Sequence, residues 1–149
     1  MSARLAEIGQ LLRTQDNRIT AHPIFVVQRK VRVYGIDPDL AGEHVWHHSD
    51  GSDADAEMTA LLDEDYERGH RIPGEWNRTW YHEHWAWVQP FFTEEGAKEY
   101  LRVNGHNVRG ETRIYVESGF RNAEWQAVRE HLMGMEAPTA PAASEEASK

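Results

Sequence analysis

The pattern of hydrophobic and polar positions in the first part of the chain predicts a helix followed by a strand. Residues 2–15 carry one apolar stripe at helical spacing, formed by Leu5, Ile8, Leu11 and Leu12. Pro23 excludes a helix at the next position, and residues 24–34 are rich in the β-branched and aromatic side chains that favour a strand. We therefore expect the chain to begin as a helix and then to enter a sheet.

The segment from residue 40 to residue 53 follows neither a helical nor a strand period. Within it, Val45 and Trp46 are apolar and predict a short extended piece. Residues 47–53 contain histidine, serine, aspartate and glycine, which together are typical of a loop. We do not count this extended piece among the strands of the predicted sheet.

A second helix is predicted over residues 54–68. Its N-cap is Asp53 or Ser52, because either side chain can accept a hydrogen bond from the first turn. Gly69 is placed to stop the helix. The apolar face expected to point inward consists of Met58, Leu61, Leu62 and Tyr66.

The next elements are a long strand over residues 78–88 and a third helix. Pro90 ends the strand because it cannot donate a ladder hydrogen bond. Thr93 caps the helix, which runs to about Val103 and closes at Asn104-Gly105 in a left-handed cap. The chain should therefore turn sharply at this point before it re-enters the sheet.

The last predicted elements are a strand at residues 112–117 and a helix at residues 123–133, which Asn122 caps. Residues 136–149 consist of small, proline and polar residues, so we expect a disordered tail. The fold class is α+β, with about three strands packed by about four helices over residues 1–135. Helical crossovers between the strands would permit parallel pairing.

Charge is concentrated in one part of the chain, an acidic segment at residues 37–67. The formal net charge of the 149 residues is −9, and this segment alone holds eleven acids and no Lys or Arg. Such a segment repels phosphate, so a nucleic-acid face there is not expected. It attracts a basic protein surface, although solvation of an exposed face is the simpler interpretation.

Cysteine is absent from the chain, which excludes disulfides, Cys-ligated metals and a thiol nucleophile. No apolar run reaches the ~18 residues of a membrane span, and no signal peptide is visible. These features predict a cytosolic protein. Neither a nucleophile elbow nor a phosphate-binding glycine loop is present, so the sequence favours a binding protein without a cofactor over an enzyme.

Histidine is unusually frequent, with nine residues in the chain. His82 and His84 stand two positions apart, so on a strand both point to one face and could bind a metal. His47, Asp50 or His106 would have to supply a third ligand. A metal-dependent hydrolase is therefore one alternative function, and ordinary surface histidines are the simpler interpretation.

Tryptophan is also frequent, with six residues. Most of them, namely Trp80, Trp85, Trp87 and Trp125, are expected to build the core over the sheet. Trp46 lies in a polar, acidic stretch with little reason to be buried, so it is the best candidate for an exposed interface anchor. A further alternative is a single-strand nucleic-acid binder, which would use exposed aromatic side chains beside the basic run at residues 29–32.

The second half of the chain resembles a known group of proteins. The matching stretches are WAWVQPFFTEEGAKEY at residues 85–100, NGHN at residues 104–107 and RIYVESGFRNAEW at residues 113–125. With residues 22–37, they resemble small proteins of unassigned function encoded by tailed bacteriophages and prophages. The resemblance covers about residues 22–133 and carries no role onto the acidic segment.

The resemblance implies a phage accessory protein that acts in the host cytoplasm by protein–protein binding. Such proteins often act on host machinery, including by blocking antiviral defence systems, and an acidic protein is suited to a partner with a basic surface. The candidate contact residues in and around the acidic segment are Trp46, His47, His48, Asp50, Asp53 and Asp55. A second candidate patch contains His106, Asn107 and Arg121.

Overall fold

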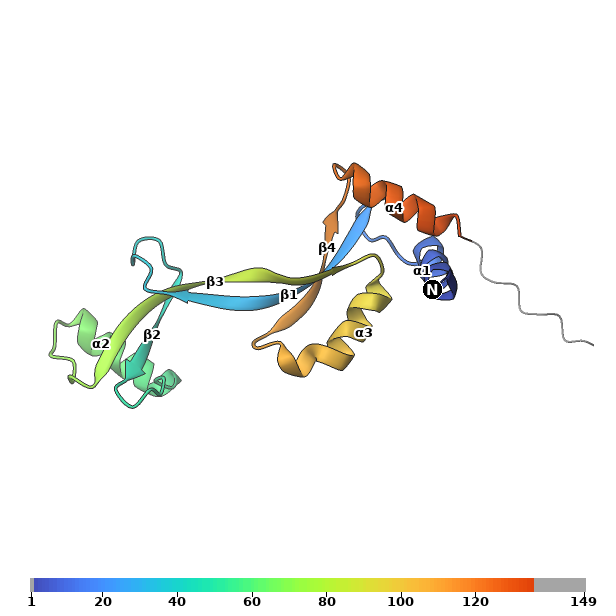
Figure 1. Cartoon of the computed structure of the whole chain (residues 1–149). Coiled ribbons are helices and arrows are strands. Elements are labelled where there is room, and N and C mark those ends of the chain that lie inside the picture. Colours follow the sequence, from blue (N-terminus) through green and yellow to red (C-terminus); the bar gives the residue numbers. More distant parts are fainter. Residues whose placement is uncertain (1, 136–149) are drawn as a thin grey trace, which may run out of the picture. The chain divides into compact units, whose positions relative to one another are not determined.

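The computed structural model describes residues 2–135, and the predicted tail at residues 136–149 lies outside them. The α+β class and the four helices are confirmed (Figure 1). The helices are α1 (Ser2–Thr14), α2 (Ala56–Glu67), α3 (Glu94–Asn104) and α4 (Ala123–Met133), with a short 3-10 helix η1 (Gly105–Asn107). The strands are β1 (Pro23–Tyr34), β2 (Glu43–His48), β3 (Trp76–Phe91) and β4 (Thr112–Ser118).

The described residues form a sheet of four antiparallel strands in the order β2-β3-β1-β4, one strand more than the three or so expected. The parallel pairing that helical crossovers would permit does not occur in this sheet. The additional strand is β2, whose sequence pattern predicts only a short extended piece. It forms because all of its residues pair with β3, from Glu43 opposite Tyr81 to His48 opposite Trp76. The pairing buries Trp46 under α2, and that burial stabilises a strand too short to be recognised by its period.

The chain divides into two compact units. Unit 1 comprises Met1–Arg29 and Trp87–Lys149, and unit 2 comprises Lys30–Ala86. The long strands β1 and β3 contribute residues to both units. Unit 2 is thus one continuous stretch of sequence, and it contains the whole acidic segment.

The core of unit 1 lies between α3 and one face of the sheet. Phe25 and Val27 of β1 are fully buried there together with Ala97 of α3. Thr93 caps α3 as expected, and its hydroxyl accepts a hydrogen bond from the Gly96 amide at 3.1 Å. Partly buried side chains complete the cluster, and they are Val88, Phe91, Tyr100, Leu101, Ile114 and Val116.

The end of α3 differs from the sequence-based expectation. Gly105 has φ −56°, a right-handed helical value, so the predicted left-handed cap is wrong. The backbone instead tightens into η1 and leaves the helix at Val108. Strand β3 also continues past Pro90 to Phe91, which a proline near the end of a strand permits when its nitrogen needs no ladder partner.

Helices α1 and α4 pack against each other in unit 1 at unusually close range. A Cβ atom added at Gly9 would lie 2.1 Å from the carbonyl oxygen of Leu132, so only glycine fits at this crossing. Arg13 of α1 donates hydrogen bonds to the carbonyl oxygens of Met133 and Met135 at the end of α4. A cation at that position also interacts favourably with the negative end of the α4 dipole.

Two tryptophans contradict the expectation that Trp46 is exposed and that Trp87 lies in the core. Trp46 is 2% exposed, whereas Trp87 is 54% exposed. Trp87 lies on the sheet face of unit 1 away from the α3 core, where its indole N–H donates to Glu117 at 2.8 Å. Alternation along a strand shows which residues share a face, but it does not show which face a helix covers.

Candidate binding surface

Nearly all of the net charge belongs to unit 2. Residues 30–86 contain five Lys or Arg and 13 Asp or Glu, a net charge of −8, whereas the rest of the chain has a net charge of −1. Among the eleven acids of residues 37–67, only two lie within 4 Å of a Lys or Arg nitrogen in the described structure. These contacts are Glu64 with Arg68 at 2.5 Å and Asp63 with Arg78 at 3.6 Å. The acidic charge of this unit is therefore largely uncompensated.

Asp63 is the carboxylate that the fold uses internally. It accepts a hydrogen bond from the Trp46 indole at 2.9 Å and lies 2.7 Å from the imidazole of His44. Burial favours the neutral acid, but the hydrogen bonds of Trp46 and His44 and the charge of Arg78 outweigh it and lower the pKa of Asp63. Asp63 thus remains ionised and joins α2 to β2 through polar contacts.

Arg78 of β3 lies among the aromatic rings beneath α2. Its guanidinium carbon is 4.5 Å from the centre of the Tyr66 ring and 4.6 Å from that of Trp80. Its Nε is buried and has no hydrogen-bond partner among the described residues. The Asp63 carboxylate is the only acidic group within 4 Å of this guanidinium in the described part of the chain. Arg78 and the rings around it therefore form a structural cluster that joins α2 to β3.

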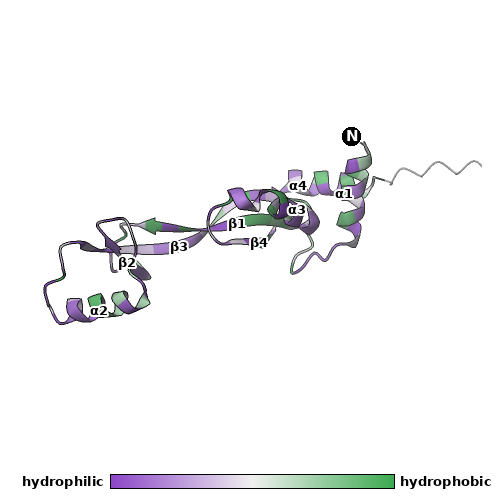
Figure 2. Ribbon diagram, turned by 90° about the horizontal axis from the view of Figure 1, so that it is seen from below, coloured by the Kyte–Doolittle hydropathy of each residue, from purple (hydrophilic) through white to green (hydrophobic). Residues whose placement is uncertain are grey.

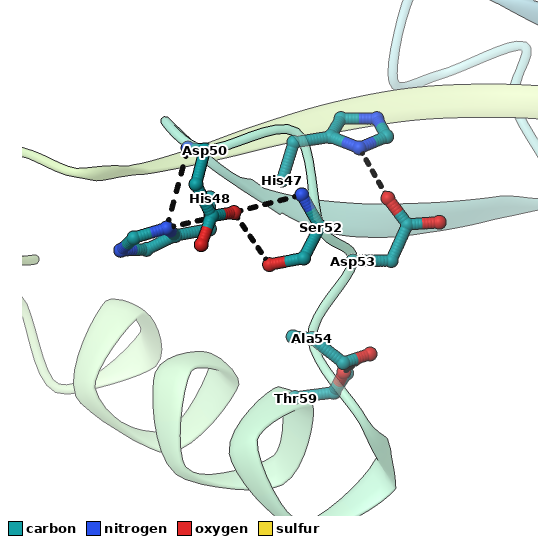
Figure 3. A network of polar contacts seen from close by, with 7 residues as sticks. All are labelled: His47, His48, Asp50, Ser52, Asp53, Ala54 and Thr59. Atoms are coloured by element: carbon teal, nitrogen blue, oxygen red, sulfur yellow. Dashed lines mark hydrogen bonds and ion pairs between the residues drawn. The ribbon is translucent and has the colours of Figure 1, made fainter.

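The loop after β2 is ordered by histidine–aspartate contacts (Figure 3). His47 lies 2.6 Å from the Asp53 carboxylate, and His48 lies 3.0 Å from that of Asp50. Asp50 also accepts hydrogen bonds from the Ser52 hydroxyl and amide at 2.6 and 2.9 Å. The Ser52 hydrogen bonds, with that of His48, lower the pKa of Asp50 to about 2.

The candidate residues of the acidic segment therefore have different roles. The prediction that Trp46 is an exposed interface anchor is wrong. Its ring is buried between β2 and α2, and its indole N–H donates a hydrogen bond to Asp63. Asp55 is the N-cap of α2 in place of Asp53 or Ser52, and it accepts a hydrogen bond from the Met58 amide. The exposed carboxylates of Asp50 and Asp53 lie on the loop that precedes this cap (Figure 3).

The outer surface of α2 combines apolar and acidic side chains, and the sequence pattern does not predict it. Of the four residues expected to face inward, only Leu62 is buried; Leu61 is 53% exposed and Met58 is 37% exposed. Glu57 and Glu67 are exposed on the same helix and make no ion pair in the described structure. Figure 2 shows hydrophilic and hydrophobic residues side by side along α2. We call this surface, formed by Glu57, Met58, Leu61, Glu64 and Glu67, the α2 surface.

His82 and His84 lie on β3 as expected, and both are exposed. Their ring centres are 5.8 Å apart. Within residues 2–135, however, no group of three or more His, Asp or Glu is arranged to hold a metal ion. The structure therefore does not bring His47, Asp50 or His106 to this pair as the third ligand that the hydrolase alternative requires.

The second candidate patch lies in unit 1. His106 and Asn107 are exposed on η1, and Arg121 is exposed in the turn before α4. Asn107 lines a shallow pocket of about 330 Å³ with Arg29 and Tyr100 among others. The pocket is open, and no carboxylate of the described residues lines it.

The basic run proposed for nucleic acid is partly neutralised inside unit 2. Glu83 of β3 lies 2.7 Å from Arg32 and 3.8 Å from Lys30. The hydrogen bond from Arg32 lowers the pKa of Glu83, which therefore stays ionised beside these cations. This contact reduces the positive potential that a phosphate backbone would need.

Comparison of the chain with protein-family models, curated proteins and solved structures finds no match. Among residues 2–135 there is also no helix with the length and apolar composition needed to cross a bilayer.

Proposed function

We propose that this chain is a protein-binding module that docks the α2 surface onto a basic surface of a partner protein. The observation that carries the proposal is the exposure of Leu61 and Met58 beside the carboxylates of α2. Of these carboxylates, Glu64 is paired with Arg68, whereas Glu57 and Glu67 make no ion pair with Lys or Arg among the described residues. Protein interfaces commonly combine an apolar centre with a charged or polar rim. The α2 surface has this composition, and the opposite side of the helix holds it against the sheet through Leu62 and Asp63.

The charge distribution supports a basic partner in particular. A net charge of −8 within 57 residues creates a local field that accelerates the approach of a positive surface and disfavours nucleic acid. The apolar side chains would then supply affinity after the charges have oriented the partner. Binding by this mechanism should weaken as salt screens the carboxylates.

The resemblance to small phage-encoded proteins supports a partner in the bacterial host. In that setting the partner is a host protein with a basic surface, including the components of antiviral defence systems that bind nucleic acid. The host cytoplasm is the compartment in which such a partner would be met. We include no catalytic step in this proposal, because the candidate residues assemble no reactive group.

The test is affinity capture from nuclease-treated bacterial lysate with the full chain as bait, followed by titration of the purified partner. We expect one basic protein to bind and to elute as salt is raised to about 0.5 M. The variant Glu57→Gln/Glu64→Gln/Glu67→Gln should lose most of this binding. Leu61→Ser should weaken it with little change in its salt dependence.

The matched control neutralises three acids of unit 1, Glu95→Gln/Glu99→Gln/Glu130→Gln, and should retain the partner. Capture of the same protein by the α2 variant and by the control to equal extents would contradict the proposal. Failure of the native chain to bind any protein in a salt-dependent manner would do so as well. Capture that occurs in a parallel untreated lysate but not in the nuclease-treated lysate would favour the nucleic-acid alternative.

A further inference from the structure

Strand β4 is the edge of the sheet in unit 1. It pairs with β1 on one side, from Thr112 opposite Arg29 to Ser118 opposite Pro23, and it is the last strand in the sheet order. Figure 2 shows β4 beside β1, with no further strand outside it among the described residues. Half of the backbone N–H and C=O groups of an edge strand point away from its neighbour. No described backbone group pairs with this outer side of β4.

This edge lacks the proline and lysine residues that proteins commonly use to block strand pairing. The seven residues TRIYVES contain no proline, glycine or lysine. The positions at which charges occur are Arg113 and Glu117, which lie two residues on either side of Tyr115. The edge is therefore able to accept another strand, and its side chains should select which one.

The side chains of β4 divide into two sets by alternation. Ile114 and Val116 lie opposite Val27 and Phe25 of β1 and pack on the buried core of unit 1. Arg113, Tyr115 and Glu117 point to the other face, where Tyr115 is 46% exposed. Each face of this short strand thus has a distinct chemistry that a pairing strand must match.

We propose that β4 pairs antiparallel with β4 of a second copy of the chain, across a two-fold axis at Tyr115. In this register Arg113 lies opposite Glu117 of the second copy, and Glu117 lies opposite Arg113 of that copy. Tyr115 meets the second Tyr115 between the two charge pairs. On the core face, Ile114 lies opposite Val116 of the second copy. A two-fold interface uses the same patch twice, so a strand must be self-complementary to form it, as β4 is.

The register follows from the sequence of the strand. Among two-fold antiparallel registers, the axis at Tyr115 pairs all seven residues and places each charge opposite its complement. An axis one residue earlier sets Arg113 opposite Tyr115, and an axis one residue later sets Glu117 opposite Tyr115. Both alternatives leave a charge without its complement and shorten the paired segment. Cross-strand pairs of opposite charge stabilise a sheet, and like charges destabilise it.

Contacts within each chain hold the two charged side chains in place for this pairing. Arg113 donates its Nε–H to Gln28 at 2.9 Å and lies over the Tyr115 ring, 4.7 Å from its centre. Glu117 accepts from Trp87 at 2.8 Å. A guanidinium has five donors and a carboxylate about four acceptor sites, so each can serve a second partner. Side chains ordered before association lose less conformational entropy on binding.

The test is the concentration dependence of the mass of the full chain, measured by sedimentation equilibrium. We expect reversible dimerisation, because seven residue pairs make a small interface. Arg113→Glu and Glu117→Arg each place like charges opposite one another twice, and each should weaken dimerisation about tenfold or more. Arg121→Glu, which changes the same charge in the turn before α4, should leave the dimer unchanged.

The decisive sample is an equimolar mixture of the two single variants. In a mixed dimer, Glu at position 113 of one chain meets Arg at position 117 of the other, and the second charge pair is Glu117 with Arg113. The mixture should therefore recover dimerisation although every intrachain contact of the substituted residues is still lost. The double variant Arg113→Glu/Glu117→Arg should recover it for the same reason. A purely structural effect of either substitution would persist in both samples.

A chain that remains monomeric at all concentrations would overturn the inference. A dimer that survives both single substitutions would also overturn it, as would a mixture that remains monomeric. Circular dichroism of each variant checks that the fold is retained. Pairing of β4 with a strand of a different protein would appear as a native chain that is monomeric alone, and it would likewise refute self-pairing.

Discussion

Asp63 offers the sharpest test of how unit 2 is held together. Its carboxylate accepts a hydrogen bond from the indole N–H of Trp46 and is hydrogen-bonded to the imidazole of His44. It also lies 3.6 Å from the guanidinium of Arg78. Asp63→Ala removes all three contacts at once. Asp63→Asn keeps an oxygen that can accept from Trp46 but deletes the charge. The two variants therefore separate the hydrogen bond from the electrostatic contribution.

The contacts of Asp63 determine how much free energy of unfolding each variant should lose. A hydrogen bond to a charged group contributes about 1.5–3 kcal/mol, and a buried donor left without an acceptor costs about 1–3 kcal/mol. The Asp63 side chain is 29% exposed, so water replaces part of what is lost. We expect Asp63→Ala to lower the free energy of unfolding by about 3–4 kcal/mol and Asp63→Asn by about 1–2 kcal/mol. Glu64→Ala, an exposed neighbour, should cost less than about 0.5 kcal/mol.

The pH dependence provides an independent check on the same residue. The pKa of Asp63 is lower in the folded chain than its ordinary value of 3.8. The ionised carboxylate therefore contributes its full stabilisation above pH 3.8, and this contribution is lost as the pH falls through the folded pKa. The difference in stability between the native chain and Asp63→Asn should shrink below that pH.

The assay is amide hydrogen exchange of β2 and α2 during urea titration, because two units need not unfold together. Global probes would average the two units and dilute the effect. Equal protection in Asp63→Ala and Glu64→Ala would refute the assignment of Asp63 as the residue that anchors α2. A stability difference that persists unchanged at pH 2 would refute the electrostatic part.

Three further outcomes are expected. Gly9→Ala should destabilise the α1–α4 pair by about 1–3 kcal/mol, measured by thermal unfolding, because its Cβ meets the Leu132 carbonyl. Asn122→Ala should cost about 1 kcal/mol in the same assay through loss of the α4 cap. The carboxyl carbon of Asp50 should titrate near pH 2 by NMR, and Ser52→Ala should move that midpoint upward toward 3.8.

The elements with strong local signals are predicted well from the sequence. Thr93 and Asn122 cap their helices as expected, because a capping side chain acts on the backbone of its own next turn. Gly69 follows α2 with φ +69°, a left-handed value that glycine adopts without strain. These features depend on neighbours within a few residues, so a single sequence contains the information.

The features that depend on distant partners are not predicted. Strand β2 exists because β3 pairs with it, and the burial of Trp46 depends on Asp63 and α2, about 17 residues further along the chain. The exposure of Leu61 is not predicted either, because the apolar pattern of a helix does not show how much of its apolar face the sheet covers. The sequence therefore points to the acidic segment, but it does not show that Trp46 is buried or that Asp55 caps α2.

The boundary between the two units falls inside β1, after Arg29, and inside β3, before Trp87, and neither strand is interrupted there. Because β3 runs antiparallel next to β1 in the sheet, the two strands and the residues between them have the topology of one long hairpin, whose connection contains β2 and α2. Replacing residues 30–86 by a short Asn-Gly turn would shorten it to an ordinary hairpin. Such a chain would lose the −8 charge while retaining every residue of the α3 core and of the β4 edge. Under the proposed function, exchange of residues 30–86 for another segment would change the partner while the α3 core and the β4 edge stay the same.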